Sequence, residues 1–185
     1  MKKKMSLIDR DDCAALVIDH QVKLLPQIHD HEHLTHEIAK TVKGLRALDI
    51  PILVTQQYTK GMGETDPEVQ AALGEFHPIE KTSFSCMANQ DFRKALKALD
   101  RHTVIILGIE AHICVMQTAL DLMRDGYRVV TVNDCIGSRA SINKEVALRR
   151  LLHAGAVPST SEMVLYELMR TSEDDAFKTI LNLVK

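Results

Sequence analysis

The chain has 185 residues, 45% of them hydrophobic and 26% charged, which is enough for one well-buried domain but too few for two ordinary ones. The formal net charge of −2 gives no electrostatic footprint for nucleic acid, and no apolar run has the length of a signal peptide or a membrane span. We therefore expect a single domain over residues 1–185 in a soluble cytoplasmic protein, with no nucleic acid and no membrane among its partners.

In chain order, short apolar runs alternate with segments of helical periodicity. The runs are rich in β-branched residues, and the helical segments repeat apolar residues every three or four positions. Strands are predicted over 13–19, 52–55, 103–107 and 127–132, with a last short strand at Val157. Helices are predicted over 34–48, 67–73, 92–99, 115–123, 143–154, 161–170 and 173–183. This alternation predicts a doubly wound α/β fold, a three-layer α/β/α sandwich around a mostly parallel sheet.

Three polar residues lie near the carboxyl ends of predicted strands: Asp19, Cys114 and Asp134. Ligands of doubly wound folds bind beyond these ends. Asp19 and Cys114 would follow two central strands, so they could share one crevice. A carboxylate in this position more often caps a loop than acts as a base, so Asp19 alone does not establish a catalytic site.

Cys114 lies where a strand turns into a helix. The unpaired N–H groups and the dipole of a helix N-terminus stabilise a thiolate and lower its pKa, and the same N–H groups can bind the oxyanion of a tetrahedral intermediate. The alternative is a small buried hydrophobe, which most free cysteines are. The four cysteines lie far apart with no C-x-x-C pair, which indicates neither a disulfide framework nor a zinc site.

Three motifs then make the chain recognisable: ALVIDHQ at 15–21, IEKTSFSC at 79–86 and GIEAHICV at 108–115. Together they resemble the isochorismatase-like cysteine hydrolase superfamily, and the resemblance covers nearly the whole chain. That superfamily includes nicotinamidases, N-carbamoylsarcosine amidases and many members without an assigned substrate. The resemblance implies the isochorismatase-like hydrolase fold.

The resemblance also implies specific site residues. The catalytic triad would be Asp19, Lys81 and Cys114. The backbone N–H groups of Glu110 and Cys114 would form the oxyanion hole, next to a non-proline cis peptide between Ile109 and Glu110. By itself Lys81 would be interpreted as a surface lysine, as most lysines are, so its role comes from the resemblance.

This triad is chemically sufficient for a covalent hydrolase. Asp19 can take the thiol proton, while the positive charge of Lys81 favours the ionised carboxylate and thiolate. The sulfur then attacks a carbonyl carbon, and the protonated Asp19 donates to the leaving group. We therefore predict a cysteine-dependent amidase that cleaves a C–N bond of a small molecule through a thioester.

His112 offers an alternative as a Cys–His pair with Cys114. Residues two apart on a helical turn do not face each other, so we expect His112 to line the substrate pocket or to pack. Gln57, Tyr58 and Phe84 are the other expected pocket residues.

No metal and no cofactor are expected. The histidines at positions 29, 31, 33 and 36 are interleaved with Asp30 and Glu32, which is more typical of a solvated segment than of a metal site. Nicotinamidases of the superfamily carry a metal-binding Asp-x-His after the second strand. Here that region is TQQY, and 55–63 resembles a subgroup with a T-x-Q-Y-x-x-G-x-G loop. This departure argues against a bound metal and against nicotinamide as substrate.

Two other functions remain open. True isochorismatases hydrolyse a vinyl ether and have no cysteine at the position of Cys114, so the resemblance favours an amide over isochorismate. A binding or thiol-redox-responsive protein could keep the same fold, because an accessible cysteine of low pKa suits a peroxide sensor. The resemblance further implies a homo-oligomer.

Overall fold

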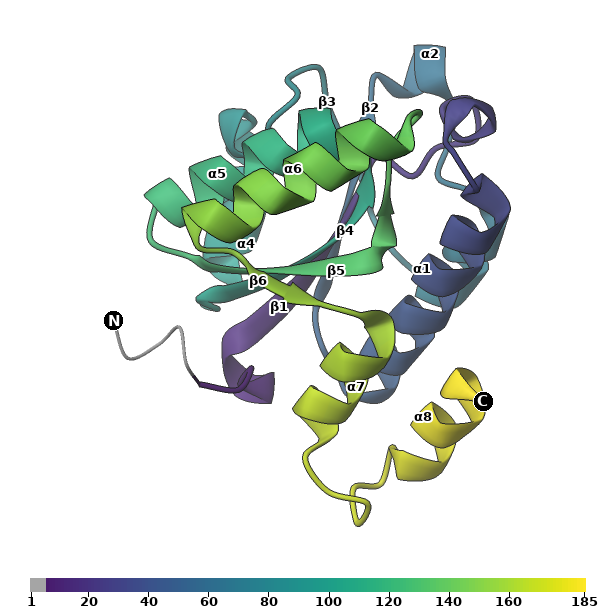
Figure 1. The fold of residues 1–185 in the computed structure, drawn as a ribbon, viewed down its shortest axis with the longest axis vertical. Helices are drawn as coiled ribbons and strands as arrows, with labels where there is room; N and C mark the ends of the chain where they lie inside the picture. The colour runs from purple at the N-terminus through teal and green to yellow at the C-terminus, as the bar shows by residue number, and fades with distance from the viewer. Residues whose placement is uncertain (1–5) are drawn as a thin grey trace.

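A computed structural model describes residues 6–185 and contains a six-stranded sheet between two layers of helices (Figure 1). All neighbouring strands are parallel, in the order β3-β2-β1-β4-β5-β6. The strands are β1 (Cys13–Ile18), β2 (Ile52–Gln57), β3 (Ile79–Lys81), β4 (Thr103–Ile109), β5 (Arg128–Gly137) and β6 (Val157–Ser159). The predicted doubly wound α/β fold is confirmed.

The helices divide between the two faces of the sheet. One layer consists of α1 (His31–Ala47), α3 (Pro67–Leu73), α7 (Ser161–Met169) and α8 (Phe177–Val184). The other consists of α4 (Gln90–Ala98), α5 (Met116–Arg124) and α6 (Ser141–Ala154). A short helix, α2 (Thr59–Met62), follows β2.

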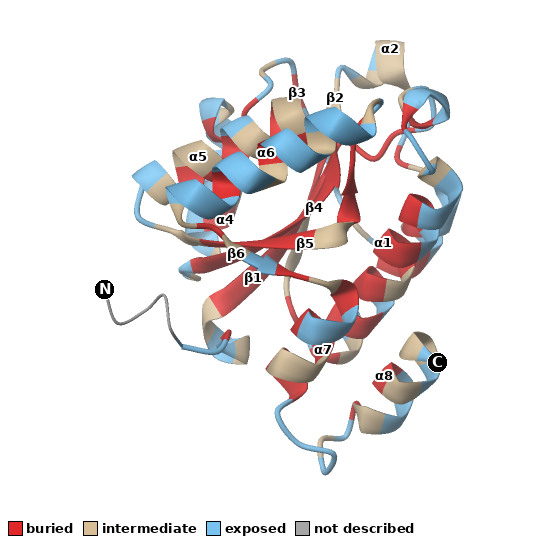
Figure 2. Ribbon diagram, in the orientation of Figure 1, coloured by how far each residue is buried: buried red, intermediate tan, exposed pale blue. Residues whose placement is uncertain are grey.

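The core has two halves, one on each side of the sheet (Figure 2). Alternate residues of β1 enter opposite halves: Val17 packs toward α1, and Ile18 packs toward α5. Every residue of β1 is buried, as expected for a parallel strand covered on both faces. No helix within residues 6–185 is both long and apolar enough to cross a membrane.

Several element boundaries differ from the prediction. The strand β3 was not predicted, because three residues, one of them the exposed Glu80, are too few to show a period. The strand β5 continues past Val132 to Gly137, through a register shift opposite β4. Asp134 therefore lies inside β5 rather than beyond its end. Its carboxylate accepts hydrogen bonds from the backbone N–H and the hydroxyl of Ser161, at the start of α7.

The order of the strands places a topological switch point between β1 and β4. The chain passes from β1 to β2 and β3 on one side, and then returns to place β4 on the other side of β1. In open α/β sheets the crevice at such a point is where ligands bind. Asp19 follows β1 directly, and Cys114 follows β4 after a short turn.

Gly108 allows β4 and β1 to approach each other closely at this point. It pairs with Ile18 and has a φ of +117°, and a Cβ added to it would lie 2.6 Å from the backbone nitrogen of Ile18. No ordinary Cβ contact is that short, and L-residues with side chains disfavour this φ.

We expect Gly108→Ala to lower the free energy of unfolding by about 3 kcal/mol or more, because backbone strain and overpacking add. Gly126→Ala is the matched control, since Gly126 also has a positive φ, of +92°, but no atom lies within 4 Å of its Cβ position. That substitution should cost about 1 kcal/mol. Denaturant unfolding of both variants measures the difference, and equal losses would show that the close approach to Ile18 contributes nothing.

Candidate active site

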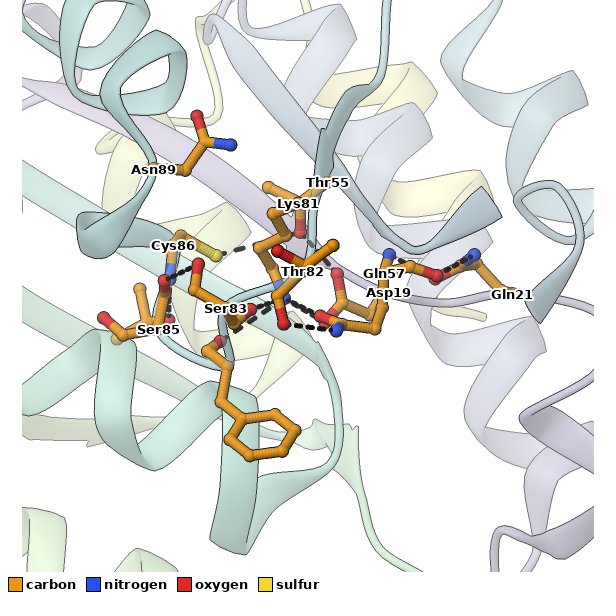
Figure 3. Close-up of polar contacts among 12 residues, drawn as sticks. Asp19, Gln21, Thr55, Gln57, Lys81, Thr82, Ser83, Ser85, Cys86 and Asn89 are labelled. Atoms are coloured by element: carbon orange, nitrogen blue, oxygen red, sulfur yellow. Dashed lines mark hydrogen bonds and ion pairs between the residues drawn. The ribbon is translucent and has the colours of Figure 1, made fainter. Parts of the chain in front are cut away.

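A buried ion pair lies beyond the carboxyl ends of β1 and β3. The ammonium of Lys81 donates to Asp19 Oδ2 at 2.6 Å, and the two side chains are 0% and 1% exposed. Asp19 is the first residue after β1, and Lys81 is the last residue of β3. The strand β2 separates the two, so the lysine side chain reaches across its end to the carboxylate (Figure 3).

Every charge of this pair has polar partners, which a buried ion pair requires. Thr55 donates its hydroxyl to Asp19 Oδ1 at 2.8 Å. The Lys81 ammonium has three further acceptors: Gln57 Oε1 at 2.8 Å and the carbonyl oxygens of Ser83 and Phe84 at 3.1 and 3.3 Å. Burial, the largest single cause, lowers the pKa of Lys81, but the charge and hydrogen bond of Asp19 together with Cys86 and Cys114 raise it above its ordinary value. The lysine is therefore charged at neutral pH.

Cys114 lies in a π-helical turn, Ala111–Val115, that connects β4 to α5. Its side chain is almost buried, with 8% of the residue exposed. Burial raises the pKa of the Cys114 thiol, the charge of Asp19 raises it further, and Lys81 lowers it. Both members of the ion pair therefore affect the pKa of this thiol.

The predicted lowering of the Cys114 pKa is wrong. The prediction considered only the local effect of a helix N-terminus, whereas the thiol is shielded from water and lies near a carboxylate. The same direction holds for the other buried cysteines; burial raises the pKa of Cys86 to about 11 and that of Cys13 to about 12. Cys114 is thus a thiol at neutral pH, and it needs a base in order to act as a nucleophile.

The turn before Cys114 contains the cis peptide that the resemblance implies, between Ile109 and Glu110. The Glu110 carbonyl accepts hydrogen bonds from the N–H groups of Ile113 and Val115, at 3.0 and 3.2 Å. Among the hydrogen bonds of residues 6–185, no backbone carbonyl accepts from the Glu110 N–H.

The expected pocket residues have different surroundings. Gln57 is committed to the ion pair, because its Oε1 binds Lys81 and its Nε2 donates to the carbonyl oxygen of Thr82 at 2.8 Å. Tyr58 and Phe84 adjoin the ion pair through their backbones, and their side chains are 47% and 54% exposed. His112 bonds through Nδ1 to the Ser138 hydroxyl at 3.1 Å. Its Nδ1 is thus engaged by Ser138.

Sequence reasoning missed Thr55, whose residue is 0% exposed and whose hydroxyl fixes one oxygen of Asp19. Thr55 pairs with Ile18 in the β1–β2 ladder, so it lies beside Asp19 at the same edge of the sheet. The thiol of Cys86 lies 3.8 Å from the Thr55 hydroxyl (Figure 3). The sequence did contain a signal for this role. Thr55 ends a predicted strand, and the neighbouring predicted strand ends in Asp19.

The histidine-rich segment lies at the start of α1, where His29, His33 and His36 are exposed. His36 Nδ1 is 3.4 Å from Glu68 Oε1. Within residues 6–185 no three His, Cys, Asp or Glu side chains are grouped so that they could hold a metal ion.

Known proteins share this fold and sequence pattern. A mouse (Mus musculus) protein named isochorismatase domain-containing protein 2A is 36% identical over 168 residues, which cover 90% of this chain and 80% of that protein. A structure named MAR1 ribonuclease from Caenorhabditis elegans superposes with a TM-score of 0.90 at 34% identity, and the match covers 97% of this chain and 92% of the other.

The protein YcaC is similar in two solved structures. YcaC from Pseudomonas aeruginosa, with hexane-2,5-diol and covalent acrylamide, has a TM-score of 0.91 and 26% identity over 97% of this chain and 92% of that one. YcaC from Escherichia coli, described as an octameric hydrolase of unknown specificity, has a TM-score of 0.90 and 27% identity over 96% of this chain and 90% of that one.

The family model described as the isochorismatase domain matches residues 13–163, which contain all three motifs and the whole sheet. Together with the mouse relative and the YcaC structures, this match confirms the resemblance found in the sequence. The chain belongs to the isochorismatase family and has its hydrolase fold.

Proposed function

We propose that this chain is a cysteine-dependent hydrolase that cleaves an amide-type C–N bond of a small molecule through a thioester at Cys114. The observation that carries the proposal is the buried Asp19–Lys81 pair at 2.6 Å, whose two charges both act on the Cys114 thiol. Burying an ion pair costs free energy, so packing alone does not explain a buried pair beside a nearly buried thiol at the switch point of the sheet.

In the proposed cycle, Asp19 accepts the thiol proton while the sulfur attacks the amide carbonyl carbon. Lys81 stays protonated and holds Asp19 in its ionised form until that transfer. The N–H groups of Glu110 and Cys114 bind the oxyanion of the tetrahedral intermediate. The C–N bond breaks, the amine leaves with the proton from Asp19, and the acyl group remains on sulfur. Water then attacks the thioester, Asp19 accepts its proton, and the thiol is restored as the carboxylic acid leaves.

The raised pKa of Cys114 fits this order of events, because the thiol is deprotonated only as it attacks. The YcaC structure from E. coli supplies independent support for the reaction class, because that protein is described as a hydrolase. The octamer of the E. coli protein supports the proposal that this chain also assembles with copies of itself.

The same observations favour the hydrolase over the alternatives. A peroxide sensor needs an exposed thiolate, whereas Cys114 is 8% exposed and its pKa is raised. The name ribonuclease belongs to the C. elegans protein, and a net charge of −2 gives this chain no electrostatic reason to bind RNA.

The proposal is tested with a panel of small primary amides, N-carbamoyl compounds and one vinyl ether, by measuring the released ammonia or amine together with the carboxylic acid. We expect equal amounts of amine and acid from at least one amide. Hydrolysis of the vinyl ether with no amide cleaved would contradict the proposal and favour isochorismatase chemistry.

Thr55 should act as a positioning residue for Asp19 in this reaction. Thr55→Val removes the hydrogen bond to the ionised carboxylate but keeps the shape of the side chain. We expect kcat/KM to fall about tenfold, because the Asp19 carboxylate loses the donor that fixes its orientation. Thr55→Ser keeps the hydroxyl and should restore the wild-type kcat/KM. An unchanged kcat/KM in Thr55→Val would exclude this role.

A further inference from the structure

A cavity of about 300 Å³ lies beyond the end of β5, outside the ion pair described above. It is bordered by the first turns of α1 and α6 and by the carboxyl end of β5, elements that Figure 1 shows together. Its polar lining consists of His29, Asp30, His33, Asp134, Ser138, Ser141 and Lys144. A cavity of this size is at the lower end of those that hold small ligands.

Lys144 is the unusual group in this cavity. It is half-buried, and burial lowers the pKa of its ammonium, while the charges of Asp134 and Asp30 raise it. Nevertheless, within residues 6–185 this ammonium has no ion pair and no side-chain hydrogen bond. The lysine has therefore lost part of its hydration without gaining an ion-pair partner.

Two carboxylates, Asp30 and Asp134, line the cavity, and Asp134 is already occupied. Both oxygens of Asp134 accept the backbone N–H of Ser161, at 2.9 and 3.1 Å, and Oδ2 also accepts the Ser161 hydroxyl at 2.7 Å. Asp134 thus stabilises the start of α7, and neither Asp134 nor Asp30 forms an ion pair with Lys144 within the described residues. An oxyanion in the cavity would supply the missing partner, whereas the lysine would repel a metal cation.

We propose that this cavity binds the carboxylate or phosphate group of a small ligand, with Lys144 as the charged partner. The imidazoles of His29 and His33 and the hydroxyls of Ser138 and Ser141 offer further N–H and O–H donors. This inference stands on the cavity and its unpaired cation, and it does not depend on the proposed hydrolysis.

One hydrogen bond links the cavity to the turn that contains Cys114. The Ser138 hydroxyl bonds to His112, which is two residues before Cys114. The bound oxyanion could therefore belong to the substrate itself, or it could be a separate ion. Glutaramate, which carries an amide and a carboxylate in one molecule, represents the first source, and inorganic phosphate represents the second.

Isothermal titration calorimetry of the full chain with these two probes tests the proposal. The variants are Lys144→Gln, Lys144→Arg and Lys43→Gln. Lys43 is exposed on α1, so its substitution removes the same charge away from the cavity. We expect Lys144→Gln to weaken binding about tenfold or more, because it removes a charge-assisted hydrogen bond, whereas the other two variants should bind within about threefold of the wild type.

Binding of glutaramate, and not of phosphate, would support a substrate carboxylate; binding of phosphate would support a separate ion. Binding of either probe supports the site if that binding is lost in Lys144→Gln and kept in Lys144→Arg. Absence of binding of both probes to the wild type, or equal binding in Lys144→Gln, would overturn it. Calorimetry needs no turnover, so this test can succeed even where the amide panel fails.

Discussion

Lys81→Met is expected to lower the free energy of unfolding by about 3–5 kcal/mol at pH 7, because it leaves the Asp19 carboxylate buried without its cation. The lysine side chain is 0% exposed and has four acceptors, so its removal leaves these acceptors without a donor in a place shielded from water. The pKa of Lys81 is raised in the folded chain, so its contribution is complete below the unfolded pKa of about 10.4 and is lost only as pH rises through the higher folded pKa. The loss should therefore be the same at pH 7 and pH 8.

Two further variants make this result specific to the buried pair. Lys94→Met removes a lysine whose partner Asp91 lies 3.3 Å away on the surface, with both side chains at least 75% exposed, and it should cost less than about 1 kcal/mol. The double variant Asp19→Asn, Lys81→Met has no uncompensated charge and should recover part of the stability. Urea unfolding measures all three. A Lys81→Met loss no larger than that of Lys94→Met would contradict the described geometry.

Cys114→Ala is expected to reduce kcat by about 10⁴-fold or more on any amide that the wild type cleaves, since the variant lacks the nucleophile. Its fold should persist, because one sulfur atom is removed from a residue that is still 8% exposed. Cys13→Ala is the matched control: Cys13 is buried at the start of β1, at the opposite end of the strand from Asp19.

Steady-state kinetics with circular dichroism of each variant checks this expectation. Cys13→Ala should turn over like the wild type. Full turnover by Cys114→Ala would exclude a covalent thiol mechanism and leave Asp19 to activate water directly.

Much of the fold could be predicted from apolar patterning, because long parallel strands are apolar throughout and their helices repeat every three or four residues. The run at Cys13–Ile18 predicts β1 to within a residue of its end. The strand β3 could not be found in this way, since its place is set by pairing with β2 rather than by its own three residues. The second half of β5 was not predicted either, because the polar Asn133 and Asp134 interrupt its apolar run.

The candidate site, too, could be predicted from the sequence only in part. The motifs point to Asp19, Lys81 and Cys114, and the structure shows the first two as a buried ion pair. The pKa of Cys114 could not be predicted, because its main cause is burial, which depends on packing from distant parts of the chain. The hydroxyl of Thr55 is a similar case, since only strand register brings it to Asp19.

Trapping the covalent intermediate tests the central claim most directly. The wild type is mixed with an amide from the panel, quenched in acid within one turnover, and digested for peptide mass spectrometry. The account predicts that the Cys114 peptide gains the mass of the acyl group, with no atom of the leaving amine, and that Cys13, Cys86 and Cys135 stay unmodified. Complete hydrolysis of the amide with no acyl group on Cys114, or with the acyl group on another residue, would contradict it.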